Sequence, residues 1–428
     1  MLEKLKQIKK PKKEAKSSSN ERLIVALDIG TEFIKALVTR IDEDNQLEIL
    51  GVGRAHQSLT DMQAGAIADI AAVVANCDSA LNQAEQLAGV SARSAVIGIA
   101  GELVKGNTTT VRFTRKDPNK QIDIAEVDHI FSLVQERALN TAKKQLAADT
   151  GGKEIGLKLV NSALIAIEID GYGVTNPIGF QGKDVQVQLY TAFAPQVHIG
   201  AIERVAEQLD LDLLTVAAEP FAVARSVIGD DPNANLSAIL IDVGGGTTDI
   251  AVVNEGGVEG TKMFGIGGRS FTKSVERDLN VDFERAEALK LGLSNGRTPD
   301  PRREPVEDAL HKTLSVWMSG IELALEEFKR LDHLPHKVLL CGGGASLEML
   351  TNTLAEDDWY TDLPFTRKPE IQLINPNQVV GITDKTGVID DHTFITAMGL
   401  LRVGIDTLLQ YDAPGTSIRD RLNKMLKT

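Results

Sequence analysis

The stretch that most constrains this chain is an apolar strand that runs into three consecutive glycines, ILIDVGGGTTDIAVV at residues 239–253. A plain hairpin can turn on a single glycine, so three in a row indicate that the backbone must approach something from outside the chain. Bare amide groups with threonine hydroxyls beside them suit the oxygens of a phosphate. Asp242 fits there if Mg²⁺ lies between the two anions, since Mg²⁺ prefers carboxylates, waters and phosphate oxygens. Taken alone, the turn has an alternative interpretation as a tight corner of a sheet.

The same pattern recurs near the start of the chain, in LIVALDIGTEFIKALV at residues 23–38. Asp28, Gly30 and Thr31 stand there between two apolar strands, as Asp242 and the glycines do in the later stretch. A repeated pattern of this kind predicts two related halves.

Three further segments complete a candidate site. Glu219 and Pro220 open a helix and supply a third carboxylate. Gly267 and Gly268 lead into another helix, whose N-terminal amides suit a phosphate. The triplet at 342–344 follows a strand and lets a flat ring or a ribose lie on the backbone. Each has a structural alternative: the triplet as a plain strand-to-helix joint, and Glu219 as a first-turn acid favoured by the helix dipole.

The composition is that of a soluble globular protein. The 428 residues suffice for two or three domains, and 43% of them are hydrophobic and 25% charged. Cys77 and Cys341 lie far apart without metal-site spacing, which favours a reducing cytoplasm and no disulfides. No run of eighteen apolar residues is present, so we expect no membrane-spanning helix.

Charge is distributed unevenly along the chain. The net charge is −14, yet residues 1–16 hold seven lysines against two glutamates, and residues 417–428 hold four basic residues against one aspartate. The segment between these ends therefore carries −22. So acidic a body argues against nucleic acid as a partner. Basic ends on an acidic body indicate that the chain binds an anionic surface, and the membrane is the obvious one.

Composition and hydrophobic periodicity divide the chain into six parts. We expect a basic flexible arm at 1–20, a first half at 21–91 and 196–236, an insert at 92–195, a second half at 237–269 and 331–409, a helical subdomain of that second half at 270–330, and a linker with a basic tail at 410–428.

The order of these motifs resembles the nucleotide-binding core of the actin, sugar-kinase and heat-shock-chaperone superfamily. Within it, IDGYGVTNPIGFQGKDVQVQL and FGIGGRSFTKSVERDLNVDFERAEALKLGLSNG are similar to segments of the FtsA family of bacterial cell-division proteins and of its relative PilM. The resemblance covers roughly residues 21–405. It implies an α/β, actin-like ATPase fold of two duplicated, ribonuclease-H-like halves with an inserted α+β subdomain of the SHS2 type.

The resemblance also implies ATP and Mg²⁺ as cofactors. Asp28, Glu219 and Asp242 would hold Mg²⁺ through waters, and Glu219 and Asp242 would be the catalytic carboxylates. The phosphates would be held by Gly30, Thr31, Gly244, Gly245, Gly246, Thr247 and Thr248, with Gly267 and Gly268 nearby, and the adenosine would lie between Glu287 and Lys290 on one side and Gly342, Gly343 and Gly344 on the other. The alternative for Lys290 is a solvated helix residue. The insert replaces the segment that supplies a catalytic residue in the chaperones and sugar kinases, so ATP binding is expected and rapid hydrolysis is not.

For function, the resemblance implies a scaffold that binds ATP, forms filaments and tethers the tubulin-like division protein FtsZ and other division proteins to the cytoplasmic face of the inner membrane. The insert would make head-to-tail contacts between subunits, and a regulatory cap is its alternative role. The alternatives for the whole chain are a PilM-like cytoplasmic adaptor for type IV pilus assembly and a small-molecule kinase. The kinase would need an acceptor-site aspartate used as a base, for which we find no further motif.

The last thirteen residues, TSIRDRLNKMLKT, predict an amphipathic helix. Apolar side chains fall on one helical face and basic side chains on its flanks and back, an arrangement typical of a helix that lies on an anionic membrane. The apolar set is Ile418, Leu422, Met425 and Leu426, and the basic set is Arg419, Arg421, Lys424 and Lys427. A tail docked on its own protein and a disordered tail are the alternatives.

Overall fold

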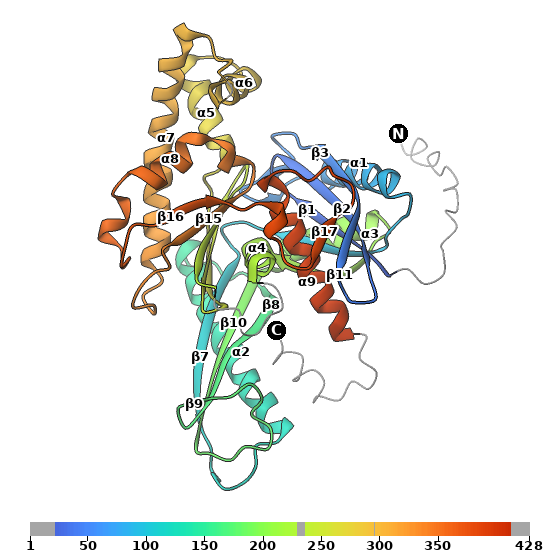
Figure 1. Ribbon diagram of the computed structural model, residues 1–428, viewed down its shortest axis with the longest axis vertical. Coiled ribbons are helices and arrows are strands. Elements are labelled where there is room, and N and C mark those ends of the chain that lie inside the picture. Colours follow the sequence, from blue (N-terminus) through green and yellow to red (C-terminus); the bar gives the residue numbers. More distant parts are fainter. Residues whose placement is uncertain (1–21, 229–235, 295, 412–428) are drawn as a thin grey trace.

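Two sheets with the same strand order dominate the computed structural model, which describes residues 22–228, 236–294 and 296–411 (Figure 1). The first sheet runs β11 (Asp212–Ala218), β6 (Ser94–Ile99), β1 (Arg22–Ile29), β2 (Phe33–Ile41), β3 (Leu47–His56) and β17 (Ile382–Asp384). The second begins β16 (Glu370–Leu373), β15 (Lys337–Cys341), β12 (Ala238–Val243), β13 (Thr248–Asn254) and β14 (Gly257–Phe264).

Strand directions repeat along with the order. β1 is antiparallel to β2 and parallel to β6, and β12 is likewise antiparallel to β13 and parallel to β15. Each central strand is almost wholly buried, as expected for strands covered on both faces. The duplicated α/β architecture that the repeated motif predicts is therefore confirmed.

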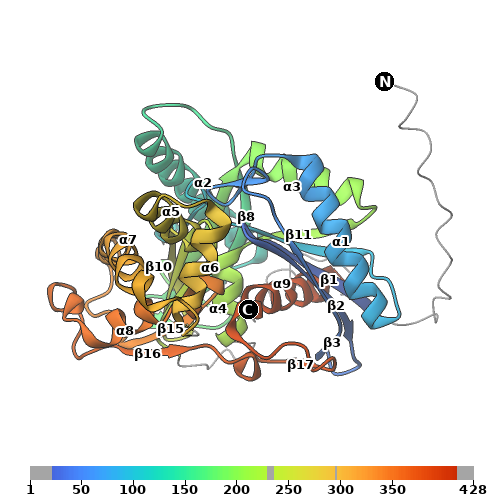
Figure 2. The ribbon, with the colours of Figure 1, turned by 90° about the horizontal axis from the view of Figure 1, so that it is seen from above.

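Two helices cross between the sheets (Figure 2). α4 (Glu219–Ile228) follows the first sheet in sequence but packs on β12, β13 and β14, whereas α9 (Ile395–Tyr411) packs on β1, β6 and β11. The helices touch at Gly399, where an added Cβ would lie 2.2 Å from the carbonyl oxygen of Ala222. Arg225 of α4 also donates through Nε and Nη2 to Asp406 Oδ2 of α9, at 3.1 and 3.0 Å. These contacts fix how the two halves meet.

The insert continues the second sheet rather than the first. β7 (Lys105–Thr114) pairs with β14, and β10 (Asp184–Pro195), β8 (Leu157–Ile169) and β9 (Tyr172–Gly173) follow it outward. α2 (Ile124–Asp149) packs on β7 and β10 around a separate core that includes Phe131, Val134 and Leu189. Asp123 caps this helix by accepting a hydrogen bond from the backbone of Glu126.

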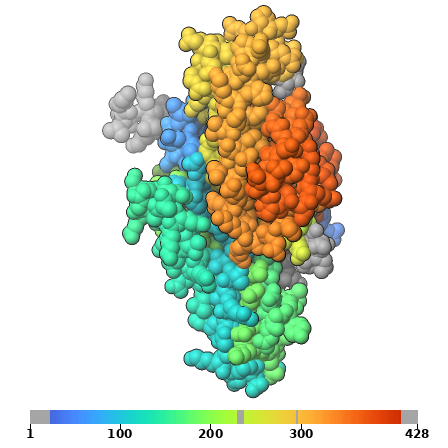
Figure 3. Space-filling view, turned by 90° about the vertical axis from the view of Figure 1, so that its left-hand side faces the viewer, coloured from blue at the N-terminus to red at the C-terminus, as the bar shows by residue number. Residues whose placement is uncertain are grey.

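The remaining helices cover the outer faces. α1 (Ile70–Ala88) and α3 (Gln196–Gln208) flank the first sheet, and α5 (Gly268–Leu279), α6 (Phe283–Ser294), α7 (Asp300–Glu326) and α8 (Glu348–Glu356) surround the second. The tips of α5, α6 and α7 and the far end of the insert form opposite ends of an elongated molecule (Figure 3). Short elements are β4 (Met62–Gln63), β5 (Ala66–Ile67) and the 3₁₀ turns η2 (Gly343–Ser346), η3 (Trp359–Asp362), η4 (Pro376–Gln378) and η5 (His392–Phe394). None of the described helices is both long and apolar enough to cross a membrane.

Strand pairing corrects the expected boundaries at three places. β6 lies in the first sheet, although we expected the insert to begin at residue 92. We expected β17 and α9 in the second half. However, β17 pairs with β3, and α9 packs on the first sheet. The physical reason is that linear order does not reveal which sheet an apolar segment joins when both sheets need covering. The arm at 1–20 and most of the segment at 410–428 lie outside the described residues.

The crossing of α4 and α9 predicts opposite effects for two helical glycines. Gly399→Ala places a methyl group against the α4 backbone and should lower the free energy of unfolding by about 1–3 kcal/mol. Gly200→Ala in α3 is the control: it meets nothing within 4 Å and should raise that free energy by about 0.5–1 kcal/mol. Urea denaturation of both variants measures the difference. Equal effects of the two substitutions would contradict the close approach.

Candidate nucleotide and metal site

A cavity of about 620 Å³ lies between the two halves, within the size range of small-molecule sites. It is lined by residues from the β1–β2 and β12–β13 hairpins, from the starts of α4 and α5, and from α6 and η2. Of the residues expected from sequence, the lining includes Asp28, Gly30, Thr31, Glu219, Asp242, Gly244, Gly245, Thr247, Gly268, Glu287, Lys290, Gly342, Gly343 and Gly344.

Three expected phosphate contacts lie elsewhere. Gly246 packs against Thr31 and Gly267 packs against Gly244, so both serve the close approach of neighbouring segments. The Thr248 hydroxyl donates to the carbonyl oxygen of Ile266 at 2.7 Å and accepts from Trp317 Nε1 at 2.9 Å. Its side chain is fully buried and its only proton is in use, so the expectation that Thr248 donates to a phosphate is wrong.

Four carboxylates gather at the floor of the cavity. Asp28 ends β1, Asp242 and Asp249 face each other across the β12–β13 pair, and Glu219 begins α4. All four are buried. Burial raises the pKa of Glu219 well above its usual value, and the charges of Asp28 and Asp249 raise it further. Burial likewise raises the pKa of Asp242, although the hydroxyl of Thr396, which donates to its Oδ2, opposes the shift.

Lys35 is the cation nearest this cluster, and the sequence analysis missed it. It lies opposite Asp28 in the β1–β2 pair, and its Nζ is 2.9 Å from Asp28 Oδ2. Burial alone would lower the pKa of Lys35, but the ion pair with Asp28 raises it overall. Counting the register back from the turn at Gly30 would have placed Lys35 beside Asp28. Thr396 was also missed, since it lies far along the chain in α9 and has no local signal.

The balance of charge fits a divalent cation. One lysine does not neutralise four buried carboxylates, and Asp249 Oδ1 has no hydrogen-bond partner in the part of the chain that the structure describes. Within those residues, no three His, Cys, Asp or Glu side chains converge closely enough to hold an ion directly. A Mg²⁺ ion would therefore be held through waters and phosphate oxygens, and Asp28, Glu219 and Asp242 fit that role.

Helix α6 contributes a second group of charged side chains to the cavity lining. Lys290 is buried, and its Nζ lies 2.8 Å from Glu287 Oε2 and donates to Thr272 Oγ1 at 2.9 Å, so it is not a solvated helix residue. Gly342 also lines the cavity and has a φ of +81°, and an added Cβ would lie 2.0 Å from Asp242 Oδ1. Only glycine fits this position, so the chain presents bare backbone to the cavity beside Asp242.

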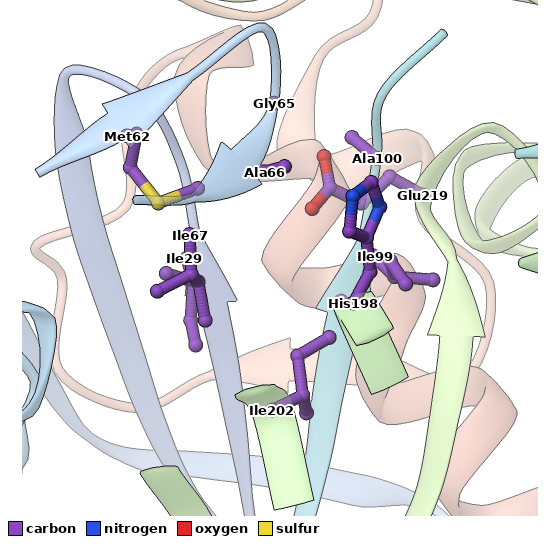
Figure 4. Close-up of a pocket in the computed structure, with 11 residues that line it drawn as sticks. Ile29, Met62, Gly65, Ala66, Ile67, Ile99, Ala100, His198, Ile202 and Glu219 are labelled. Atoms are coloured by element: carbon purple, nitrogen blue, oxygen red, sulfur yellow. The ribbon is translucent and has the colours of Figure 1, made fainter. Parts of the chain in front are cut away.

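A second, smaller cavity of about 10 Å³ lies behind Glu219, which borders both spaces. Figure 4 shows the imidazole of His198, from α3, beside the Glu219 carboxylate, with Ile99 and Ile202 below them. The space suffices for about one water molecule. His198 Nδ1 has no partner within the described residues, and burial lowers the pKa of this histidine.

Comparisons with known proteins find similar sequences over most of the chain. A family model described as "Cell division protein FtsA" matches residues 239–399. FtsA of Pseudomonas aeruginosa is 26% identical over 408 residues, which cover 91% of each chain. FtsA of Bacillus subtilis is 27% identical over 383 residues, which cover 85% of this chain and 83% of that protein. The chain is FtsA-like.

The predicted resemblance to FtsA is thus confirmed, and the fold is actin-like. Among solved structures, a chain of the PilM–PilN type IV pilus biogenesis complex superimposes with a TM-score of 0.63 at 16% identity, covering 89% of this chain and 98% of that one. At that identity the likeness shows the shared fold alone. The candidate membrane residues of this FtsA-like chain, at 418–427, lie outside the described residues.

The buried Asp249 predicts a pH-dependent stability. Its pKa is raised well above 3.8 by burial and by Asp242, so the folded FtsA-like chain keeps a proton that the unfolded chain loses near pH 4. Without ligand, the free energy of unfolding therefore falls as pH rises from the pKa of Asp249 in the unfolded chain to its raised pKa in the folded chain. The fall is about 1.4 kcal/mol for each pH unit in that range. Asp249→Asn removes the loss and should stabilise the protein more at pH 8 than at pH 5.

Thermal unfolding at both pH values, in buffer without Mg²⁺, measures this effect. Asp212→Asn, at an exposed site on β11, is the matched control and should change stability equally at the two pH values. A stabilisation by Asp249→Asn that does not depend on pH would contradict the assignment.

Proposed function

We propose that this FtsA-like chain binds ATP with Mg²⁺, forms filaments on the cytoplasmic face of the inner membrane, and tethers the tubulin-like division ring there. The observation that carries the proposal is the likeness to FtsA, which extends over 91% of both chains for the Pseudomonas protein. The cavity between the halves supports the nucleotide part, because its lining supplies both buried carboxylates and bare glycine backbone.

In this proposal the two hairpin turns hold the phosphates. Gly30, Thr31, Gly244, Gly245 and Thr247 line the cavity, and α5 begins beside them at Gly268. When bound, Mg²⁺ would neutralise charge on the phosphate oxygens. Asp28 and Asp242 would orient the waters of such an ion. Glu219 borders the cavity from α4 and is placed to accept a proton from a water, which makes it the residue on which any slow hydrolysis depends.

Glu287 and Lys290 are proposed to hold the nucleoside end. Their ion pair closes one side of the cavity, and the backbone of Gly342, Gly343 and Gly344 closes the other. Leu291 and Leu347 line the same region and offer apolar surface to a base. The nucleoside would then lie between this ion pair and the glycine backbone, with apolar surface beside it.

Membrane attachment rests on the basic tail at 417–428. Its net charge of +3 is worth about 3 kcal/mol on an anionic leaflet, to which the apolar face adds. Ordering about a dozen residues costs roughly 1 kcal/mol each, so one tail binds weakly. A filament joined through the insert presents many tails and binds far more tightly. Polymerisation and attachment are mutually dependent in this proposal.

Binding of Mg²⁺ and ATP should raise the melting temperature. At a hundred times its dissociation constant, the ligand adds about 2.7 kcal/mol to the free energy of unfolding. Asp242→Ala should abolish the shift, whereas Asp212→Ala, an exposed aspartate on β11, should keep it. Differential scanning fluorimetry with and without Mg²⁺ measures both, each variant being compared with its own ligand-free state. A wild-type shift in Asp242→Ala would refute the site assignment.

The tether is tested by co-sedimentation with anionic vesicles and the tubulin-like division protein of the same cell. With Mg²⁺ and ATP, the full chain should carry that protein into the pellet, and Leu422→Asp should leave both in the supernatant because it puts a charge on the apolar face. Asn423→Asp is the control on the polar side of the tail and should reduce pelleting only slightly. If vesicles pellet the full chain and Leu422→Asp equally, the tail is not the anchor. A full chain that pellets without the tubulin-like protein would contradict the tether.

A further inference from the structure

One turn of the second half, Gly265–Arg269, is held by the first half through side chains that the proposed nucleotide contacts do not use. Arg269 Nε donates to Glu32 Oε2 at 2.6 Å, and its Nη2 donates to the carbonyl oxygen of Gln57 at 3.2 Å. From the other side, Glu102 Oε1 accepts a hydrogen bond from the backbone N–H of Gly265 at 2.6 Å. The turn is therefore bound by the first half at one end and, at the other, by the link that joins β6 to the insert.

The pair of Arg269 and Glu32 is not an ordinary surface ion pair. The Arg269 side chain is 10% exposed and that of Glu32 is 24% exposed. Glu32 is oriented further by His56, whose Nε2 lies 2.8 Å from Oε1. A shielded, charge-assisted pair with fixed geometry contributes more than the small amount typical of exposed pairs, and breaking it leaves two charges short of partners.

The pair also lies where the two hairpin turns meet. Glu32 directly follows Thr31, Arg269 directly follows Gly268, and both line the large cavity. The backbone N–H of Arg269 donates to the carbonyl oxygen of Gly245 at 2.8 Å, and an added Cβ on Gly245 would lie 2.9 Å from the Cβ of Glu32. These contacts hold the two turns together beside the cavity.

We infer that Arg269 is a positioning residue that clasps the two halves at the phosphate end of the cavity and sets the rate at which a bound nucleotide leaves. This inference rests on the proposed nucleotide site. Separation of the turns breaks the ion pair and the hydrogen bond to Gln57 together, so the clasp adds to the barrier for exit. Entry is less affected, because an open cleft has already lost both contacts. The clasp thus acts on residence time.

The test is the dissociation of a fluorescent ATP analogue, mant-ATP with Mg²⁺, chased with excess ATP in a stopped-flow instrument. Arg269→Gln and Glu32→Gln should each raise the dissociation rate about tenfold, with a much smaller change in the association rate. The charge-swapped double variant, E32R with R269E, should bring the rate back toward that of the wild type. Arg277→Gln, on the same helix but at a 69% exposed side chain, is the matched control and should leave the rate unchanged.

The possible outcomes distinguish a failure of the inferred role of Arg269 from a failure of the proposed nucleotide site. Unchanged dissociation in both single variants would overturn the inference. So would a loss of mant-ATP affinity in Arg269→Gln with normal kinetics in Glu32→Gln, because that result makes Arg269 a direct phosphate ligand. If the wild type does not bind mant-ATP at all, the proposed function fails.

A ligand-free measurement tests the clasp independently of nucleotide. Amide hydrogen exchange at residues 244–247 and 265–269 should be faster in Arg269→Gln and Glu32→Gln than in the wild type and in Arg277→Gln, because the turns separate more often. Equal exchange in all four proteins would overturn the inference even if nucleotide binds.

Discussion

The contact between α4 and α9 is the constraint on which the rest of this structure depends. Each helix belongs by sequence to one half and covers the sheet of the other, and the two backbones approach closely at Gly399. Their N-terminal ends carry Glu219 and Thr396, the latter bonded to Asp242. The crossing therefore both joins the halves and places site residues from different parts of the chain at one point. The partial positive charge of these helix ends also favours anionic groups there.

Burial of the carboxylates at the floor of the cavity destabilises the fold. It raises the pKa values of Glu219, Asp242 and Asp249, and the charges of neighbouring carboxylates raise them further. A protein that only needed a stable core would place apolar groups at the ends of these strands. A cost of this kind is typical of functional sites that hold charged ligands.

Much of the fold followed from local patterns, and the site followed in part. Aspartate and glycine at the ends of apolar strands predicted the duplicated hairpins because that chemistry depends only on neighbouring residues. The positions of β6, β17 and α9 did not follow, since pairing between distant segments leaves no trace in local periodicity. Thr248 was misassigned because consecutive residues in a strand point to opposite faces, so Thr247 and Thr248 cannot both reach the cavity.

The pairing of the insert with the second sheet has a mechanical consequence. Both ends of the insert emerge from elements of the first half, β6 and α3, but its strands hydrogen-bond to β14. A rotation of one half about the crossing helices therefore carries the insert along with the second sheet while its roots stay behind. The strain falls on the short link of residues 100–104, which contains Glu102 and forms part of the cavity wall at Ala100. Because the insert extends far from the cleft, a small rotation of the second half moves the far end of the insert through a larger distance.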